Sequence, residues 1–342
     1  MAARRGDTLL FAQGPVIAAH AAVGGKKEGE GPLAAEFDEV FPDNGCGQTS
    51  WEAAEKILQL RAARLCLKKA HVPDTSIRLV LAGDLQAQCT ASGYALRELG
   101  LPFVGLFGAC STMAEAVGLG AALCHAGLAD GLLAMTSSHF CTAERQFRTP
   151  LSYGAVRTPT AQWTATAAGC CLLRPVGQGV SVAAVTFGRV QDYQIKDINN
   201  MGAAMAPAAA ATLLHYLKDT GEEPKNFDAV YTGDLGQVGS RMFREILTAE
   251  GLVMKNHIDC GCILYDAEHQ AVKSGGSGPG CCAAVLCGHI LPRLECGSYR
   301  RVLFLATGAL MSQTTFLQKE SIPAIAHLIE LRGPGCGKGD AG

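Results

Sequence analysis

The segment from Phe107 to Thr112, FGACST, places a cysteine between a glycine-containing turn and a run of small residues typical of a helix. A cysteine in the first turn of a helix lies near unpaired backbone N–H groups and the positive end of the helix dipole, which favour a thiolate and attract anionic ligands. Ser111 and Thr112 follow and supply hydroxyl and N–H groups for capping or for a ligand. Cys110 is therefore a nucleophile, a ligand contact or a buried packing thiol.

A nucleophilic thiol needs a base, which directs attention to the histidines. His139 is the foremost candidate, because the segment TSSH at 136–139 ends an apolar strand pattern, where α/β sheets place ligand-binding groups. We expect Ser137, Ser138 and His139 to line the mouth of a site. Arg145 follows soon after and suits carboxylate recognition through paired donors. The alternative interpretation is a polar loop with a capped turn.

Two matching turns supply carboxylates. LVLAGDL at 79–85 and AVYTGDL at 229–235 each end a strand pattern in Gly-Asp-Leu, so Asp84 and Asp234 occupy corresponding positions. Aspartate in a turn often only caps the backbone. The glycine-rich segment at 275–280, which contains Ser277, lacks the following Lys-Ser or Lys-Thr of a Walker loop but can bring backbone N–H groups close to a ligand.

The sequence favours no metal site. His257, Asp259, Cys260 and Cys262 are metal-ligand types, but three of them lie within four residues and no second matching pair exists. We therefore expect neither a bound metal nor a cofactor.

The elements that must position these residues alternate between short β-rich runs and longer helical patterns, which predicts an α/β fold with mainly parallel strands. In the first half we expect helices at 51–69, 91–99 and 110–128 and strands at 77–82, 103–107, 131–136, 168–173 and 180–190. In the second half we expect helices at 206–218, 240–250 and 281–295 and strands at 229–232, 262–265 and 301–306.

The order of elements repeats, and GACSTMAEAVGLGAAL in the first half is echoed by GPGCCAAVLCGHIL in the second. Two echoes in the same order indicate an internal duplication. We place the halves at 1–176 and 177–342 and expect an added hairpin in 257–276, where the second half is longer. The helix at 110–128 is apolar on all sides and should be buried between sheets.

Composition narrows the function classes. The chain has 342 residues, 48% of them hydrophobic, a formal charge of −2 and no Lys/Arg run longer than two, so charge favours neither nucleic acid nor an anionic membrane as a partner. Fifteen cysteines without a CxxC pair are typical of buried thiols in a reducing compartment. Polar residues interrupt both the N-terminal apolar stretch and the segment 117–135, so we expect no signal peptide and no transmembrane helix.

Motifs along nearly the whole chain resemble the stage V sporulation protein AD family, which has a thiolase-like fold. The similarity rests on LAGDL (81–85), FGACST (107–112), TSSH (136–139), TAERQFR (142–148), MGAAMAPAAA (201–210), TGDLGQVG (232–239), DCG (259–261), GGSGPGC (275–281), ATGAL (306–310) and IPAIAH (322–327). The resemblance implies a layered α/β/α/β/α sandwich of two duplicated halves, with the ligand pocket around Cys110. It also implies a homodimer.

The resemblance implies a non-catalytic protein that binds dipicolinic acid, alone or as its calcium chelate, and supports its uptake into developing spores. It implies a cytoplasmic location or a peripheral one on the spore inner membrane, together with other membrane proteins of the dipicolinate channel. Asp84 and Asp234 would then contact chelated calcium. An active thiolase or ketoacyl-synthase-like acyltransferase using Cys110 is the alternative, but the turns at 232–239 and 275–280 hold neither His nor Asn to activate the thiol.

Overall fold

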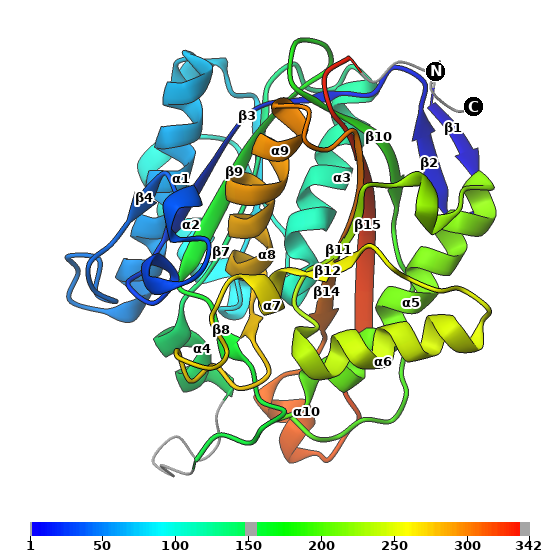
Figure 1. Cartoon of the computed structure of the whole chain (residues 1–342). Coiled ribbons are helices and arrows are strands. Elements are labelled where there is room, and N and C mark those ends of the chain that lie inside the picture. Colours follow the sequence, from blue (N-terminus) through cyan, green and yellow to red (C-terminus); the bar gives the residue numbers. More distant parts are fainter. Residues whose placement is uncertain (1, 148–155, 336–342) are drawn as a thin grey trace.

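Strands β3 (Val16–Gly24) and β10 (Val180–Thr186) pair antiparallel at the centre of a large sheet in this computed structural model, which describes residues 2–147 and 156–335 (Figure 1). The strand order is β12-β11-β14-β15-β10-β3-β9-β7-β5-β6. The remaining strands are β5 (Leu79–Gly83), β6 (Phe103–Gly105), β7 (Leu132–Ser138), β9 (Ala167–Arg174), β11 (Ala229–Thr232), β12 (His257–Asp259), β14 (Arg301–Ala309) and β15 (Ala324–Arg332).

The order and direction of the strands are the same when the sheet is followed from either edge to its centre. In the first half β5 is parallel to β6 and β7, whereas β9 runs antiparallel to β7 and β3. In the second half β11 is parallel to β12 and β14, whereas β15 runs antiparallel to β14 and β10. The duplicated α/β architecture is thus confirmed, although only the outer three strands of each half are parallel.

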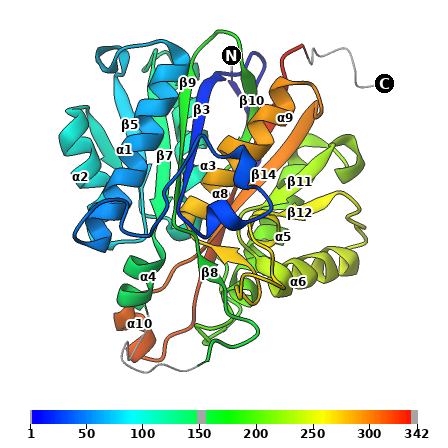
Figure 2. The same ribbon diagram turned by 60° about the vertical axis from the view of Figure 1, so that its left-hand side comes forward.

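Helices form three layers around the strands (Figures 1 and 2). Helices α1 (Trp51–Ala70) and α2 (Thr90–Leu99) cover the outer face of the first half. Helix α5 (Met201–Thr220) covers that of the second, and α6 (Gly236–Ala249) packs against α5. Helices α3 (Thr112–His125) and α8 (Pro279–Val285) lie between the halves, and a π-helical turn (Leu286–Ile290) joins α8 to α9 (Leu291–Glu295). This arrangement confirms the predicted α/β/α/β/α layering.

The predicted burial of the α3 region is confirmed, and its small residues explain how both halves approach it. A Cβ on Gly118 would lie 2.8 Å from Val185 of β10, and one on Gly120 would lie 2.8 Å from Leu132 of β7. Larger side chains at these positions would push the two sheets apart.

The segment 257–276 differs from the prediction. Residues 262–265 do not form a strand, because Asp259 accepts a hydrogen bond from the Cys262 N–H at 3.1 Å and starts the short helix α7 (Cys260–Ile263). The expected hairpin is also absent from this fully described segment. Instead β13 (Gly276–Ser277) pairs with β8 (Trp163–Thr164), a contact between the two halves.

The remaining elements are the N-terminal strands and two short helices near the ends of β7 and β14. The N-terminal apolar stretch forms buried strand β3, preceded by the strands β1 (Ala2–Arg5) and β2 (Thr8–Phe11), while β4 is Glu39–Val40. Helices α4 (Phe140–Phe147) and α10 (Gln313–Leu317) lie at the end of the molecule where β7 and β14 finish. Within the described ranges, every helix is too short or too polar to span a lipid bilayer. The division at residues 176 and 177 falls between β9 and β10 and stays a prediction about domains.

Candidate functional site

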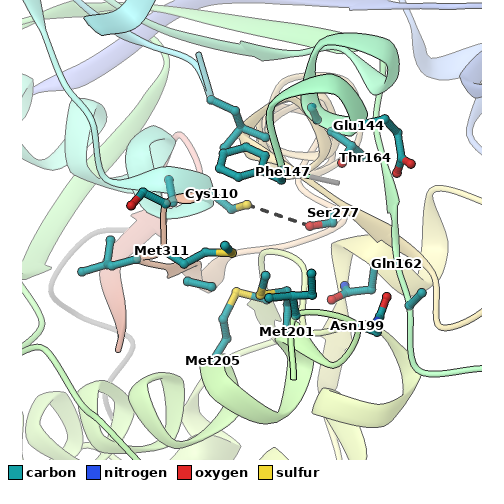
Figure 3. A pocket seen from close by; sticks show the side chains of 18 of the residues that line it. Cys110, Glu144, Phe147, Gln162, Thr164, Asn199, Met201, Met205, Ser277 and Met311 are labelled. Carbon is teal, nitrogen blue, oxygen red and sulfur yellow. Dashed lines mark hydrogen bonds between the residues drawn. The ribbon is translucent and has the colours of Figure 1, made fainter. Parts of the chain in front are cut away.

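A cavity of about 590 Å³ lies where segments of both halves meet. Its apolar wall comes from the segment before Cys110, from α4, from the start of α5 and from the segment after β14, and includes Phe107, Phe147, Met201, Met205 and Met311. Its polar lining includes Cys110, Glu144, Arg157, Gln162, Thr164, Asn199 and Ser277 (Figure 3). The volume is within the range of small-molecule sites.

Cys110 lies on the 3-10 turn Ala109–Ser111 that precedes α3 and is 8% exposed. Its Sγ is 3.9 Å from the Ser277 Oγ (Figure 3). Burial raises the pKa of the thiol well above its ordinary value, and the negative charge of Asp234 raises it further. Cys110 is therefore a protonated thiol at neutral pH, in contrast to the activated thiolate that its position before a helix suggests.

The N–H groups of Ser111 and Thr112 do not face the cavity as free donors. The Ser111 N–H and Oγ both donate to the Gly108 carbonyl, at 3.1 Å and 2.6 Å. The Thr112 N–H and its Oγ1 both donate to the Ala109 carbonyl, with the Oγ1 contact at 2.7 Å. Ala109 has a φ of 53°, and the tight turn built on it uses the donors that an anion would need. Neither residue lines the cavity.

Asp234 lies behind Ser277 and is fully buried. Its carboxylate accepts hydrogen bonds from the Thr307 Oγ1 at 2.6 Å, the Ser277 Oγ at 3.1 Å and the Gly278 N–H at 3.1 Å. Burial raises the pKa of Asp234 despite these donors. The structure thus joins Cys110 of the first half with Ser277 and Asp234 of the second, each more than a hundred residues away from the cysteine.

Ser137 and Ser138 lie at the end of β7 and point to opposite faces of the sheet, as successive strand residues do. Ser137 donates to Glu55 of α1 at 3.0 Å, whereas Ser138 donates to the Ala165 carbonyl at 2.7 Å. Both are buried and neither lines the cavity. The structure therefore does not place these serines at the mouth of this cavity.

His139 is also buried and lies outside the cavity lining. The Cys141 N–H donates to its Nδ1 at 3.1 Å, which leaves Nε2 as the donor to the Asn44 carbonyl at 2.8 Å. Trp51 stacks on the ring with a centroid separation of 5.6 Å. Burial lowers the pKa of His139, so the imidazole is neutral and fully engaged in structural bonds. With both ring nitrogens engaged, His139 is not available as a base for the Cys110 thiol.

Asp84 belongs to a second buried carboxylate cluster, beneath α1. It accepts hydrogen bonds from the N–H and the Oγ of Ser92, at 2.8 Å and 2.6 Å, and from the Gln86 N–H at 2.8 Å. The adjacent Glu55 accepts from the Gln86 Nε2 and the Thr142 Oγ1, at 2.7 Å and 2.8 Å. Burial raises the pKa of Glu55 to about 8, and the charge of Asp84 adds to the shift. Burial thus favours the protonated form of Glu55, and neither Glu55 nor Asp84 lines the cavity.

Arg145 lies outside the cavity and forms an ion pair with Glu52 of α1. The reason is the helical period of α4, because Ala143, Glu144 and Phe147 share the face that lines the cavity and Arg145 projects from another face. Arg145 thus lies outside this cavity, and its role in carboxylate recognition stays a prediction.

Arg157 lines the cavity instead and was not predicted. Its guanidinium donates to the Glu144 Oε1 at 2.7 Å and to the Gln162 carbonyl. It also lies 5.5 Å and 5.4 Å from the ring centroids of Phe140 and Trp163, which stack face to face at 3.7 Å. These contacts fix a cation in the wall of the cavity. The pairing of β8 with β13 brings the segment to the site, and no local sequence signal indicates it.

Gln162 was also missed. Its Nε2 donates to the carbonyls of Asp234 and Gly276, at 2.6 Å and 2.8 Å, while its buried Oε1 has no hydrogen-bond partner. An unpaired oxygen in a cavity wall offers an acceptor to a ligand.

Metal-ligating side chains do not cluster in the described part of the chain, where no group of three His, Cys, Asp or Glu is placed to hold an ion. His257 and Asp259 both bond to Thr232, at 2.9 Å and 2.6 Å. Asp84 and Asp234, the expected contacts of chelated calcium, are already satisfied by protein donors.

Comparison with known proteins gives one family. The model of stage V sporulation protein AD matches residues 5–332. Stage V sporulation protein AD of Bacillus subtilis (strain 168) is 41% identical over 322 residues, which cover 94% of this chain and 95% of that protein.

Solved structures with the same fold are condensing enzymes of low sequence identity. The 3-oxoacyl-[acyl-carrier-protein] synthase III of Aquifex aeolicus VF5 is similar with a TM-score of 0.58 at 11% identity, over 93% of this chain and 99% of that one. Cerulenin-bound OleA of Xanthomonas campestris has a TM-score of 0.60 at 16% identity, over 96% and 99%. OleA with bound lauric acid and lauroyl-CoA has a TM-score of 0.56 at 13% identity, over 94% and 100%. These similarities show the thiolase-like fold alone.

Proposed function

Because the chain belongs to the stage V sporulation protein AD family and so has a role in sporulation, we propose that it is a non-catalytic binding protein for dipicolinic acid. The proposed ligand site is the cavity around Cys110. The ligand enters as the acid anion or as its calcium chelate, and its binding supports uptake into developing spores.

The state of Cys110 carries the non-catalytic part of the proposal. Its thiol is buried and protonated, and no histidine is among the described residues that line the cavity. The groups beside it are the Ser277 hydroxyl and the buried Asp234 carboxyl, neither of which is an imidazole base. A thiol in this setting packs against a ligand and is a poor nucleophile.

The chemistry of the wall supports an aromatic dicarboxylate. Arg157 offers a guanidinium that matches carboxylate geometry, and Ser277, Thr164 and Asn199 offer further hydrogen-bonding groups. The apolar remainder of the lining suits a flat ring. Ring and carboxylates thus each meet complementary groups in one cavity.

Calorimetry with dipicolinate and its 3,5-isomer tests the proposal. The isomers have the same charge and size, but only the 2,6-isomer chelates calcium through its ring nitrogen, so a difference in affinity measured without calcium reports the shape of the site. We expect the 2,6-isomer to bind more tightly to the wild type, and we expect Cys110→Ala to change its affinity. Parallel titrations with and without calcium show which form is bound. Equal affinity for both isomers would contradict a specific pocket.

A second candidate function, acyl transfer by Cys110, is favoured by the apolar wall and by the condensing-enzyme fold of OleA and the synthases. Incubation with acetyl-CoA followed by intact mass measurement separates the two functions. We expect no adduct. An acetyl adduct on the wild type that is lost in Cys110→Ala would replace the binding proposal with a catalytic one.

We also propose that the protein works beside membrane proteins of the dipicolinate channel, peripherally on the spore inner membrane, as a homodimer. Edge strand β6 and the residues after it expose apolar side chains, with Val104 44% and Phe107 56% exposed, which suits a contact between copies. Sedimentation of wild type and Val104→Asp tests the dimer, and a wild-type monomer at micromolar concentration would contradict it. Copurification of membrane proteins from sporulating cells tests the partners, and recovery without any of them would contradict that part.

A further inference from the structure

Three of the eight methionines in the chain line the cavity. Met201 and Met205 lie four residues apart on α5 and therefore share one face of the helix. Met311 comes from the segment after β14, on a different part of the second half. Figure 3 shows the three side chains extending toward the space next to Cys110 and Ser277. Thioethers from two separate elements thus converge on one cavity.

Methionine differs from leucine in its polarisable sulfur and in its third rotatable side-chain bond. Sulfur makes favourable contacts with aromatic rings, worth about 0.3–1.5 kcal/mol each, whereas it gains less from saturated groups of the same size. Met205 lines the cavity while only 1% exposed to solvent, whereas Met201 and Met311 are half-buried.

Figure 3 shows Glu144 and Thr164 on one side of the drawn cavity and the three methionine side chains gathered toward another, with Gln162 and Asn199 beside Met201. Arg157 donates to Glu144, so a ligand whose carboxylate reaches this guanidinium can extend its ring toward the methionines.

We propose that Met201, Met205 and Met311 form a thioether surface that recognises the aromatic ring of the ligand and selects planar aromatic dicarboxylates over saturated ones. This inference rests on the proposed function, because it takes dipicolinate as the ligand. It adds the residues that determine specificity for the ring, which the carboxylate contacts alone cannot provide.

Calorimetry with two ligands tests the selection. The ligands are dipicolinate and cis-cyclohexane-1,3-dicarboxylate, which places two carboxylates on a saturated ring. The proteins are the wild type, the triple variant Met201→Leu, Met205→Leu, Met311→Leu, and Met254→Leu as a control at a buried methionine outside the cavity. Leucine conserves volume and apolarity, so the fold is expected to persist.

We expect the triple variant to lose about fivefold or more in affinity for dipicolinate while its affinity for the saturated ligand stays within about threefold. Met254→Leu should leave both affinities unchanged. If the wild type binds dipicolinate and the triple variant keeps the same ratio between the two ligands, the thioether surface is refuted and the proposed function stands. If the wild type does not bind dipicolinate, the proposed function itself fails.

A second measurement does not depend on the variants. Methionine methyl groups labelled with ¹³C report a nearby aromatic ring through ring-current shifts. Dipicolinate should shift the methyl signals of Met201, Met205 and Met311 and leave the buried core Met113 unmoved. Binding in the calorimeter without shifts at these three methyls would overturn the inference.

Discussion

Arg157→Gln removes the one guanidinium that lines the cavity in the described part of the chain, and its expected effect can be worked from the contacts. The side chain is 20% exposed, so its bonds are only partly screened by water. A hydrogen bond to a charged group contributes about 1.5–3 kcal/mol, equivalent to roughly ten- to hundredfold in affinity. Because Glu144 already pairs with this guanidinium at 2.7 Å, a ligand carboxylate must compete, and we expect the lower end of that range.

The assay is calorimetric titration of dipicolinate at constant ionic strength, with Arg145→Gln as the matched control. Arg145 carries the same charge on neighbouring α4 but pairs with Glu52 outside the cavity, so its replacement should leave affinity unchanged. Glu144→Gln should strengthen binding, because it removes a negative charge beside Arg157. Equal losses for both arginine variants would show that only net charge matters, and no loss for Arg157→Gln would refute the assigned role.

Three further predictions concern the scaffold of the site. Burial raises the folded-state pKa of Glu55 from 4.5 to about 8, so the protonated form is favoured in the folded protein and the free energy of unfolding should fall as pH rises through that interval. Denaturant unfolding measured across this pH range should show a weaker pH dependence of stability for Glu55→Gln than for the wild type. The same pH dependence in both proteins would contradict the shift. Iodoacetamide at neutral pH should alkylate the exposed Cys296 before the buried Cys110, because a bond to Ser298 lowers the pKa of Cys296 whereas burial raises that of Cys110. Peptide mapping measures the two rates. Faster modification of Cys110 would contradict its protonated state. Gly308→Ala would place a Cβ 2.5 Å from the Gly108 carbonyl oxygen and should lower the stability measured by thermal unfolding by about 2 kcal/mol or more. The control Gly93→Ala, which has open space around the added Cβ, should be neutral or stabilising. Equal effects of the two substitutions would contradict the close approach at Gly308.

The sequence predicted the architecture because that information is local and repeated. The two Gly-Asp-Leu turns follow strands β5 and β11, which occupy matching places in the sheet. The apolar pattern after Cys110 predicted a helix buried between sheets, and α3 is that helix. The segment 262–265 was misassigned because its β-like residues follow Asp259, whose side chain caps a helix.

The site was harder to predict because it depends on contacts between distant segments. Cys110 and Ser277 were both identified, and the structure brings them within 3.9 Å. The state of the Cys110 thiol depends on Asp234, and the identity of the cavity arginine depends on a strand pair between 163–164 and 276–277. No spacing within the sequence indicates either contact. The period of α4, by contrast, could have excluded Arg145 once Phe147 was placed in the wall.

A structure of the protein with dipicolinate bound tests the central claim most directly. We predict the ring in the cavity beside Cys110, with a carboxylate within hydrogen-bonding distance of the Arg157 guanidinium and the Cys110 Sγ unmodified. A ligand bound outside this cavity, or a covalent adduct on Cys110, would contradict the account.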